Sequence, residues 1–538
     1  QCLYRHRHRY QSRSRLWAST PAHTHQPKSP PTKARVANCP PNSSYTLPYT
    51  GVIEPTMKNE LLKDILRRPD DDSPRLVLAD WLSERGDPRG EFITLQCALA
   101  RMDPSHEGFA PTWARCERLL RDNRAPRAAE LEAKLAAQQW ANRSLEINFH
   151  RGFIEELTLS PDQFEAHAEW LCQKVPLRKV TLSWYRDTSL LAIASSPVWH
   201  RLRAIALHNL TSQLGSAADL LVSPYEVLEE FDITECGFGV RGIQLLIKAL
   251  ADSPLRRLVL HGNRIGNGGV GHLLKSGLLA RLIELDLGAN KITDRGLDAL
   301  LSSDNLGKLR SFSLAGTPKT TIGQKLARWP GLAQMQRLNL RGAMDGTQLD
   351  ALFAADQELR HLSRLDLRSC MKHLDQTRAQ RLANLPFANL SFLKIGNGRI
   401  GPQGMKALAA SATMSHLVHL NARINGIGDE GVEAIVNSPY LTRLVHLDLS
   451  KNKLSNRSLE ALAQWPGLKN MTHLDLSNNG KIREAGLQAL IDSPYLDPVA
   501  IELWGSGVKH NGHREMLWDR FKTSAHFEHG SWTPPLGA

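Results

Sequence analysis

The sequence lacks long apolar segments and paired cysteine motifs. No run of about 18 apolar residues occurs in its 538 positions, so no membrane-spanning helix is expected. The basic start, QCLYRHRHRYQSRSRLW, has no apolar stretch like that of a secretory signal, so export is not predicted. The seven cysteines are odd in number and scattered, and none forms a CxxC pair, which favours reduced thiols. These features predict a cytoplasmic protein that does not bind membranes.

Motifs of common catalytic classes are missing as well. The chain contains no GxSxG, HExxH or P-loop pattern. The glycine-rich segment GNGGVG at 266–271 lacks the strand–helix–strand context and the ribose-binding acid of a dinucleotide site. We therefore predict that the protein is not an enzyme and uses no cofactor or bound metal.

Basic residues are concentrated at the start of the chain. The net charge is +13, and residues 1–56 hold eight Lys or Arg against the single Glu54. This segment is poor in aliphatic residues, which predicts a disordered tail. Met57 opens the first stretch with helical periodicity, so one interpretation places the true start there and treats 1–56 as an artefact. The remaining charge of about +6 is too small to indicate nucleic-acid binding by itself.

A repeat of 26 to 28 residues fills the second half of the chain. Each unit contains an apolar residue, any residue, an apolar residue, and then a small or polar stop. The first apolar positions are Phe231, Leu258, Leu285, Phe312, Leu338, Leu365, Leu393, Leu420, Leu447, Leu474 and Ile501. A fixed period of this length indicates stacked units that bury their apolar faces only against their neighbours. The pattern predicts a leucine-rich solenoid.

One unit illustrates the expected local structure. Leu447 and Leu449 lie two apart and point into the core from a short strand. Asn452 ends the strand, and its equivalents can form a stacked ladder through their amides. A helix follows, for example over 458–462. Because helices are wider than the spacing of paired strands, the strands line the inside of an arc. The fold class is therefore α/β: a horseshoe with a parallel sheet on its concave face and helices on its convex face.

The segment after residue 56 predicts a small helical module. Leucines and an isoleucine form one stripe over 58–67. Ser73 before Pro74, and Asp87 before Pro88, resemble a capping residue followed by a proline in the first helical position. Acidic residues throughout the module are interpreted as helix caps and a solvated face, with an acidic docking surface as the alternative.

The run RPDDDSPRLVLADWLSERGDPRGEFITLQ carries a resemblance to a known family. It closely resembles the repeat-companion domain found near the N-terminus of large paralogous proteins of planctomycete bacteria. The likeness covers about 45 residues. Members of that family often continue into leucine-rich repeats of the ribonuclease-inhibitor type. The resemblance implies an architecture and a bacterial origin rather than a mechanism.

These observations divide the chain into six expected parts. They are a basic tail over 1–56, a helical module over 57–102, a helical bridge over 103–144 broken at Pro126, irregular N-terminal repeats over 145–230, the solenoid over 231–508, and a C-terminal cap and tail over 509–538. The bridge is expected to connect the module to the repeats.

Residues that alternate with the core leucines are expected to face the concavity. Five arginines could recognise carboxylate or phosphate, with an intramolecular charge lattice as the alternative. Three histidines on successive strands lie beside two aspartates and could sense pH or share a metal, although ordinary solvated histidines are the favoured interpretation. The predicted partner-binding residues are Arg337, Arg341, Arg364, Asp366, Arg368, Phe392, His419, Arg423, His446, Asp448, His473, Asp475 and Trp504.

The predicted function is a protein-interaction scaffold that displays this concave surface. A protein partner is favoured over a small molecule because the concavity is expected to be open. The first alternative is binding of nucleic acid or another polyanion through the arginines and the basic tail. The second is an uncharacterised hydrolase with its site in the helical module. The sequence does not identify the partner or the oligomeric state.

Overall fold

The computed structural model describes residues 54–136, 145–183, 190–209, 219–221, 224–317, 320–370, 373–496, 500–508 and 531–532. The described chain separates into two compact units. Unit 1 contains the residues up to Arg101 together with His150–Gly152, and unit 2 contains Met102–Phe149 and the residues from Phe153 onward. The tail was expected over 1–56; residues 1–53 lie outside the described residues, as does most of the C-terminal segment, whereas 54–56 belong to the first helix. None of the described helices is both long enough and apolar enough to cross a bilayer.

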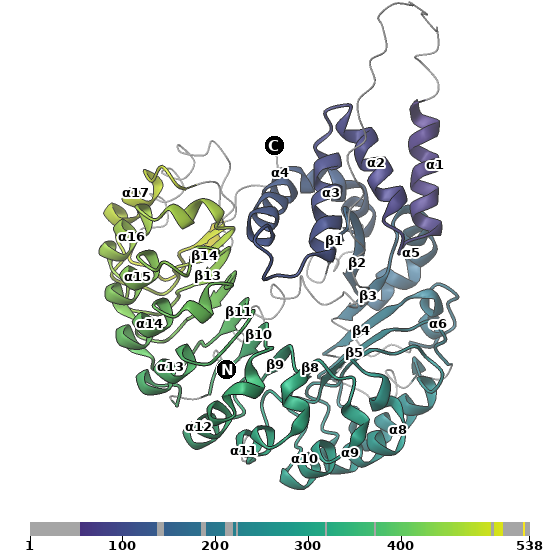
Figure 1. The fold of residues 1–538 in the computed structure, drawn as a ribbon. Helices are drawn as coiled ribbons and strands as arrows, with labels where there is room; N and C mark the ends of the chain where they lie inside the picture. The colour runs from purple at the N-terminus through teal and green to yellow at the C-terminus, as the bar shows by residue number, and fades with distance from the viewer. Residues whose placement is uncertain are drawn as a thin grey trace, which may run out of the picture. The chain divides into compact units, whose positions relative to one another are not determined.

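The described residues of unit 1 form helices that follow one another along the chain (Figure 1). They are α1 (Glu54–Arg67), α2 (Ser73–Ser83) and α3 (Pro88–Arg101). Leu78 and Leu82 of α2 and Phe92 and Ile93 of α3 are buried, as expected for the two faces of a helical hairpin. α3 begins at Pro88 as predicted.

The start of α2 differs slightly from the prediction. Ser73 is the first helical residue rather than the cap, and Asp72 occupies the capping position. The Ser73 N–H donates to Oδ1 of Asp71 (2.8 Å), so a carboxylate satisfies this free amide instead of the serine hydroxyl.

Carboxylates of unit 1 take part in internal ion pairs. Asp72 pairs with Arg101 (2.6 Å) and with Arg151 (3.4 Å). The next residue, Gly152, has a φ of +86°, and an added Cβ would lie 2.3 Å from the side chain of Ile93. Only glycine fits this position without displacing α3. The ion pairs of Asp72 support the interpretation of the acidic residues as structural.

Unit 2 is built on one curved sheet of sixteen strands among the described residues, hydrogen-bonded in chain order. The strands are β1 (Glu146–His150), β2 (Phe153–Leu159), β3 (Lys179–Ser183), β4 (Ala204–His208), β5 (Glu230–Thr234), β6 (Arg257–Val259), β7 (Glu284–Asp286), β8 (Ser311–Ser313), β9 (Arg337–Asn339), β10 (Arg364–Asp366), β11 (Phe392–Lys394), β12 (His419–Asn421), β13 (His446–Asp448), β14 (His473–Asp475), β15 (Ala500–Glu502) and β16 (Ser531–Trp532). Pairing is parallel from β2 to β15 and antiparallel between β15 and β16.

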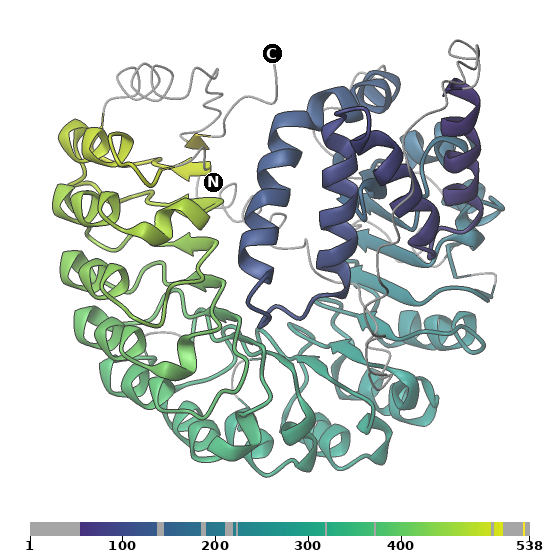
Figure 2. The same ribbon diagram turned by 45° about the horizontal axis from the view of Figure 1, so that its top comes forward.

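Helices cover the outer side of this sheet (Figure 2). They are α5 (Pro161–Lys174), α6 (Leu191–Ala194), α8 (Gly239–Ala249), α9 (Gly266–Lys275), α10 (Asp294–Leu301), α11 (Ile322–Ala327), α12 (Gly346–Ala354), α13 (Gln376–Ala383), α14 (Gly401–Ala409), α15 (Gly428–Val436), α16 (Asn456–Ala463) and α17 (Glu484–Ile491). The glycine-rich segment at 266–271 begins α9, one of these outer helices. The predicted fold class, an α/β solenoid with parallel strands inside and helices outside, is confirmed.

The repeated leucines form the core of unit 2. Leu365, for example, lies in register with Leu338 on one side and Leu393 on the other, and all three are buried. The same alignment continues through every strand from β5 to β15. Each unit therefore buries its apolar residues against its two neighbours, as its period indicates.

Buried asparagines connect successive repeats, as predicted. Oδ1 of Asn452 accepts from the N–H of Asn425 (2.9 Å), and Oδ1 of Asn479 accepts from the N–H of Asn452 (2.8 Å). Asn263 and Asn290 are joined in the same way (2.9 Å). These side chains satisfy backbone groups where strands end, so their role is structural. Cys236 and Cys370 occupy equivalent positions and are buried.

The predicted break in the bridge helix is wrong. α4 runs unbroken from Phe109 to Ala136 through Pro126. Proline removes one helical hydrogen bond and costs about 3 kcal/mol. Burial of Leu119 before it and of Leu131 and Leu135 after it offsets that cost.

Candidate binding surface on the inner face

The register of the sheet places the predicted residues in columns along the inner face. One column contains Arg257, Glu284, Ser311, Arg337, Arg364, Phe392, His419, His446 and His473. The next contains Asp286, Ser313, Asn339, Asp366, Lys394, Asn421, Asp448, Asp475 and Glu502. Side chains in a column belong to paired strands about 4.8 Å apart, so their charges interact directly.

Two of the five predicted arginines are neutralised by nearby carboxylates. Arg337 pairs with Glu284 (2.6 Å), which also pairs with Arg257 (3.0 Å). Although burial raises the pKa of Glu284, the two arginines hold it below its ordinary value. Arg368 donates to both oxygens of Asp366, at 2.6 Å to Oδ2 from Nη2 and 3.0 Å to Oδ1 from Nε. The contacts of Arg337 and Arg368 are those of the alternative interpretation, an intramolecular lattice of charges.

Two other cations on this face have no such partner. Within the described residues, neither Arg364 nor Lys394 forms an ion pair or donates a side-chain hydrogen bond. The guanidinium carbon of Arg364 lies 4.0 Å from the ring centroid of Phe392. Burial and then Arg337 lower the pKa of Arg364 to about 9. Burial and then Arg368 lower the pKa of Lys394 to about 8. Both residues are half-buried.

Lys394 was not among the predicted binding residues. Its place in the second column, between Asp366 and Asn421, was visible in the sequence. The sequence did not show that Lys394 lacks a carboxylate partner, because this depends on the ion pair between Arg368 and Asp366. The remaining predicted cations, Arg341 and Arg423, are exposed and half-buried, respectively.

The three predicted histidines form a stack with Phe392. Ring centroids lie 5.8 Å apart for Phe392 and His419, 4.1 Å for His419 and His446, and 4.2 Å for His446 and His473. The two histidine pairs are nearly parallel, with interplanar angles of 15°. Burial lowers the pKa of His419 and of His446 well below the ordinary value, and neighbouring cationic and imidazole groups lower both further. His419 and His446 are therefore neutral at pH 7. His419 is buried, whereas His446 and His473 are half-buried rather than fully solvated.

Buried carboxylates lie beside this stack. Asp448 accepts from Nδ2 of Asn421 (2.6 Å), and Asp475 accepts from the N–H of Ser477 (2.8 Å). Burial raises the pKa of Asp448, and burial together with Asp448 and Glu502 raises the pKa of Asp475 well above its ordinary value. In the part of the chain that the structure describes, no three His, Cys, Asp or Glu side chains are placed to hold a metal ion.

The bridge helix covers part of the inner face. Trp113 of α4 packs against Phe392, with ring centroids 6.3 Å apart, and against Phe109 at 5.8 Å. Trp113 is only 7% exposed. Arg118 donates to the carbonyl of Lys469 (3.4 Å). The bridge is thus more than a connector, and the concavity is not open throughout.

The loop before α4 is held at the amino ends of β12 and β13. Arg443 donates to the carbonyls of Pro104 (3.4 Å), Ser105 (2.6 Å) and His106. Nδ1 of His416 lies 3.1 Å from the same carbonyl of Ser105. These contacts join residues more than 300 positions apart and fix where α4 begins.

Four segments of the repeat region match the family model described as "Leucine Rich repeat". They are residues 282–301, 413–436, 440–463 and 467–490. These segments are leucine-rich repeats. No curated protein matches the chain.

Two solved structures have a related arrangement. One is the Rad7 and Elc1 complex in yeast, at 16% identity and a TM-score of 0.46, covering 86% of this chain and 96% of that one. The other is an internalin from Listeria monocytogenes, at 14% identity and a TM-score of 0.30, covering 72% and 92%. At these TM-scores neither likeness bears on function.

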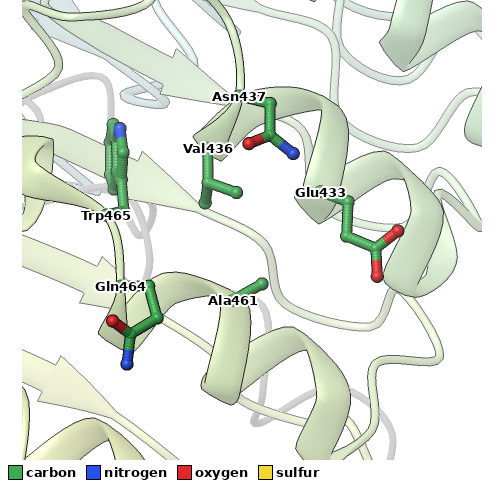
Figure 3. A pocket seen from close by; sticks show the side chains of 6 residues that line it. All are labelled: Glu433, Val436, Asn437, Ala461, Gln464 and Trp465. Carbon is green, nitrogen blue, oxygen red and sulfur yellow. The ribbon is translucent and has the colours of Figure 1, made fainter.

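The outer helices of the leucine-rich repeats contain a shallow hollow between α15 and α16 (Figure 3). Its volume is about 220 Å³, and its lining residues are Glu433, Val436, Asn437, Ala461, Gln464 and Trp465. Glu433 is already paired with Arg457 (2.5 Å). The hollow contains none of the predicted binding residues, so the inner face remains the candidate surface.

The contact of α4 with the leucine-rich repeats leads to a testable expectation. Replacing Trp113 by Ala removes a buried ring and is expected to cost about 3–5 kcal/mol of local stability. Hydrogen exchange over residues 109–119 should then be at least tenfold faster. Replacing Trp504, which is 43% exposed, by Ala serves as the control and should leave this exchange unchanged. Equal protection of α4 in the Trp113 variant would contradict the packing described here.

Proposed function

We propose that this protein is a non-catalytic interaction scaffold that binds a protein partner through the inner face of its leucine-rich repeats. One observation carries the proposal: cationic side chains gather on four adjacent strands, β9 to β12, at positions set by the register of the sheet. The proposed partner-binding residues outside this cluster are Phe392, the histidine stack, Asp448, Asp475 and Trp504.

Preorganisation supports binding at this face. The asparagine ladder and the leucine core hold the strands, so their side chains are displayed with little freedom left to lose. A partner that docks on such a surface does not have to order a loop, which lowers the entropic cost of association. Residues at the centre of an interface contribute most when they are aromatic or arginine, and both types are present here.

The proposal also includes the finer assignments made from the sequence. Residues 57–102 are assigned to the repeat-companion domain of planctomycete proteins, 103–144 to the bridge, 145–230 to irregular repeats, and 231–508 to ribonuclease-inhibitor-type repeats. The alternation of strands with outer helices of 8–11 residues in most units supports the last assignment. A cytoplasmic location is proposed from the scattered cysteines, because the five in the described residues form no disulfide with one another.

Site-specific photocrosslinking of the full chain in cells of its source organism tests the proposed function. A benzophenone amino acid replaces Arg341 or Trp504, which are exposed on the inner face, and the adducts are identified by mass spectrometry. We expect protein adducts from these positions.

Controls carry the same amino acid at Arg360 or Lys406, which are exposed outside the inner face. These positions should not give the same adducts. Identical adducts from all four positions would refute binding at the inner face. Adducts with nucleic acid alone would establish the alternative function, for which the arginine cluster on β9–β12 is the supporting observation.

A further inference from the structure

Arg364 and Lys394 form the part of the inner face where positive charge is least compensated. They lie on adjacent strands, β10 and β11, one in each column. Neither has an ion-pair partner within the described residues, whereas the neighbouring Arg337 and Arg368 do. Diagonal neighbours on one face of a sheet are within reach of long side chains. One short anionic segment can therefore contact both cations.

The contact between Arg364 and Phe392 leaves the hydrogen-bond donors of the arginine available. The guanidinium carbon lies over the ring, 4.0 Å from the ring centroid. Within the described residues, no side-chain hydrogen bond from Arg364 accompanies this contact. The fork of N–H donors that binds a carboxylate is therefore not taken up by another protein group.

The free protein does not stabilise these two charges well. Burial and neighbouring cations lower the pKa of Arg364 and of Lys394. A bound anion would supply the missing opposite charge to both. This is the pattern expected of charges kept for a ligand rather than for folding, because unpaired half-buried cations cost stability.

Flanking carboxylates limit the size of the anion. Glu284 and Asp286 of β7 lie on one side of the cationic strands, and Asp448, Asp475 and Glu502 of β13 to β15 lie on the other. The cationic zone from β9 to β12 spans three strand spacings, about 14 Å. An extended polyanion would cross carboxylates at both ends and be repelled, whereas a short acidic segment fits between them.

We propose that Arg364 and Lys394 form an anion-binding site for a short acidic segment, rich in Asp or Glu, of a partner protein. This inference rests on the proposed function, since it names the chemistry of the partner at the same face. Carboxylates of the segment contact the guanidinium edge of Arg364 and the ammonium group of Lys394. Asp366 at the end of β10 is already occupied by the bidentate contact from Arg368, so this pair is not assigned to the site.

Fluorescence anisotropy with a labelled tetraglutamate peptide, which spans about 13 Å when extended, tests the site in the full chain. The variant Arg364→Met/Lys394→Met keeps side-chain length and removes both charges. We expect its affinity for the peptide to fall at least 30-fold. The control Arg360→Met/Lys406→Met removes the same charges from exposed positions outside the inner face and should change affinity less than twofold.

Thermal stability separates a binding role from a structural one. Removing two under-compensated cations should leave the melting temperature of the double variant unchanged or raise it. Arg368→Met, which leaves Asp366 unpaired, should lower it. If the double variant does not fold, Lys394→Gln provides the same test with an expected affinity loss of about tenfold.

Several outcomes would overturn the inference. They are absence of peptide binding at millimolar concentration, an equal loss of affinity in the control, or a lower melting temperature of the double variant with unchanged affinity. A single-stranded oligonucleotide that binds more tightly than the peptide, and is lost in the double variant, would assign the site to nucleic acid instead. Protein adducts in the photocrosslinking experiment that persist in the double variant would leave the proposed function standing while refuting this site.

Discussion

Replacing Asn452 by Ala is expected to lower the stability of the surrounding repeats by about 3–5 kcal/mol. The side chain is fully buried, and its amide satisfies backbone groups on both sides. Its Oδ1 accepts from the N–H of Asn425 (2.9 Å), and its Nδ2 donates to the carbonyls of Ala422 (3.0 Å) and Ser450 (3.3 Å). Alanine would leave the N–H of Asn425 buried without a partner, at about 1–3 kcal/mol. It would also remove one hydrogen bond, at about 0.5–1.5 kcal/mol, from each of the two carbonyls, which keep their bonds from Nδ2 of Asn425 and from the N–H of Ile424.

Urea denaturation together with hydrogen exchange over residues 419–456 measures this effect. Exchange should rise in the repeats next to Asn452 more than in distant ones, because repeat proteins are stabilised mainly by nearest-neighbour contacts. The control is Asn437→Ala at an exposed position of the same repeat region, which should be nearly neutral. A similar small loss in both variants would show that the ladder contributes little to stability.

Acidification is expected to destabilise the protein through its buried histidines. The pKa values of His419 and His446 are lowered in the folded state, so the unfolded chain binds protons at these residues first. Their contribution to stability is complete well above the unfolded pKa of about 6.5 and is lost as the pH falls below it. Between pH 7.5 and 5.5 the free energy of unfolding should fall by about 1.4 kcal/mol for each of the two histidines, or by about 2.7 kcal/mol for both together.

The variant His419→Phe/His446→Phe isolates this contribution. Phenylalanine preserves the aromatic stack but cannot be protonated. Asp448 and Asp475 have raised pKa values and change stability in the opposite direction, losing stability as the pH rises. Because both carboxyl groups remain in the variant, the difference between the two proteins reports the imidazoles.

Urea midpoints at pH 7.5 and 5.5 provide the measurement. The unmodified protein should lose more stability on acidification than the double variant. His361→Phe, at an exposed position, should behave as the unmodified protein does. An identical pH response in the double variant would show that the stacked rings take up protons as readily as exposed histidines.

The sequence alone determined the repeat architecture of unit 2 and the membership of its columns. The leucine period identified each strand, and alternation along the strand assigned Arg364, His419 and Asp448 to the inner face. Both inferences succeeded because a solenoid is built from contacts between adjacent repeats. A pattern repeated every 27 residues therefore specifies the three-dimensional neighbours of each position.

Tertiary structure decided which inner-face residues are available. The ion pair of Arg337 with Glu284 joins residues that are two strands and 53 positions apart. The hydrogen bond from Arg443 to the carbonyl of Ser105 joins residues that are 338 positions apart. The packing of Trp113 against Phe392 depends on where α4 lies. Sequence periodicity does not predict such contacts, because the repeat specifies only which residues are neighbours on adjacent strands. Burial and charge pairing depend on every group that packs against a side chain. For this reason Lys394 became a candidate only in the structure, and the concave face proved partly covered rather than open.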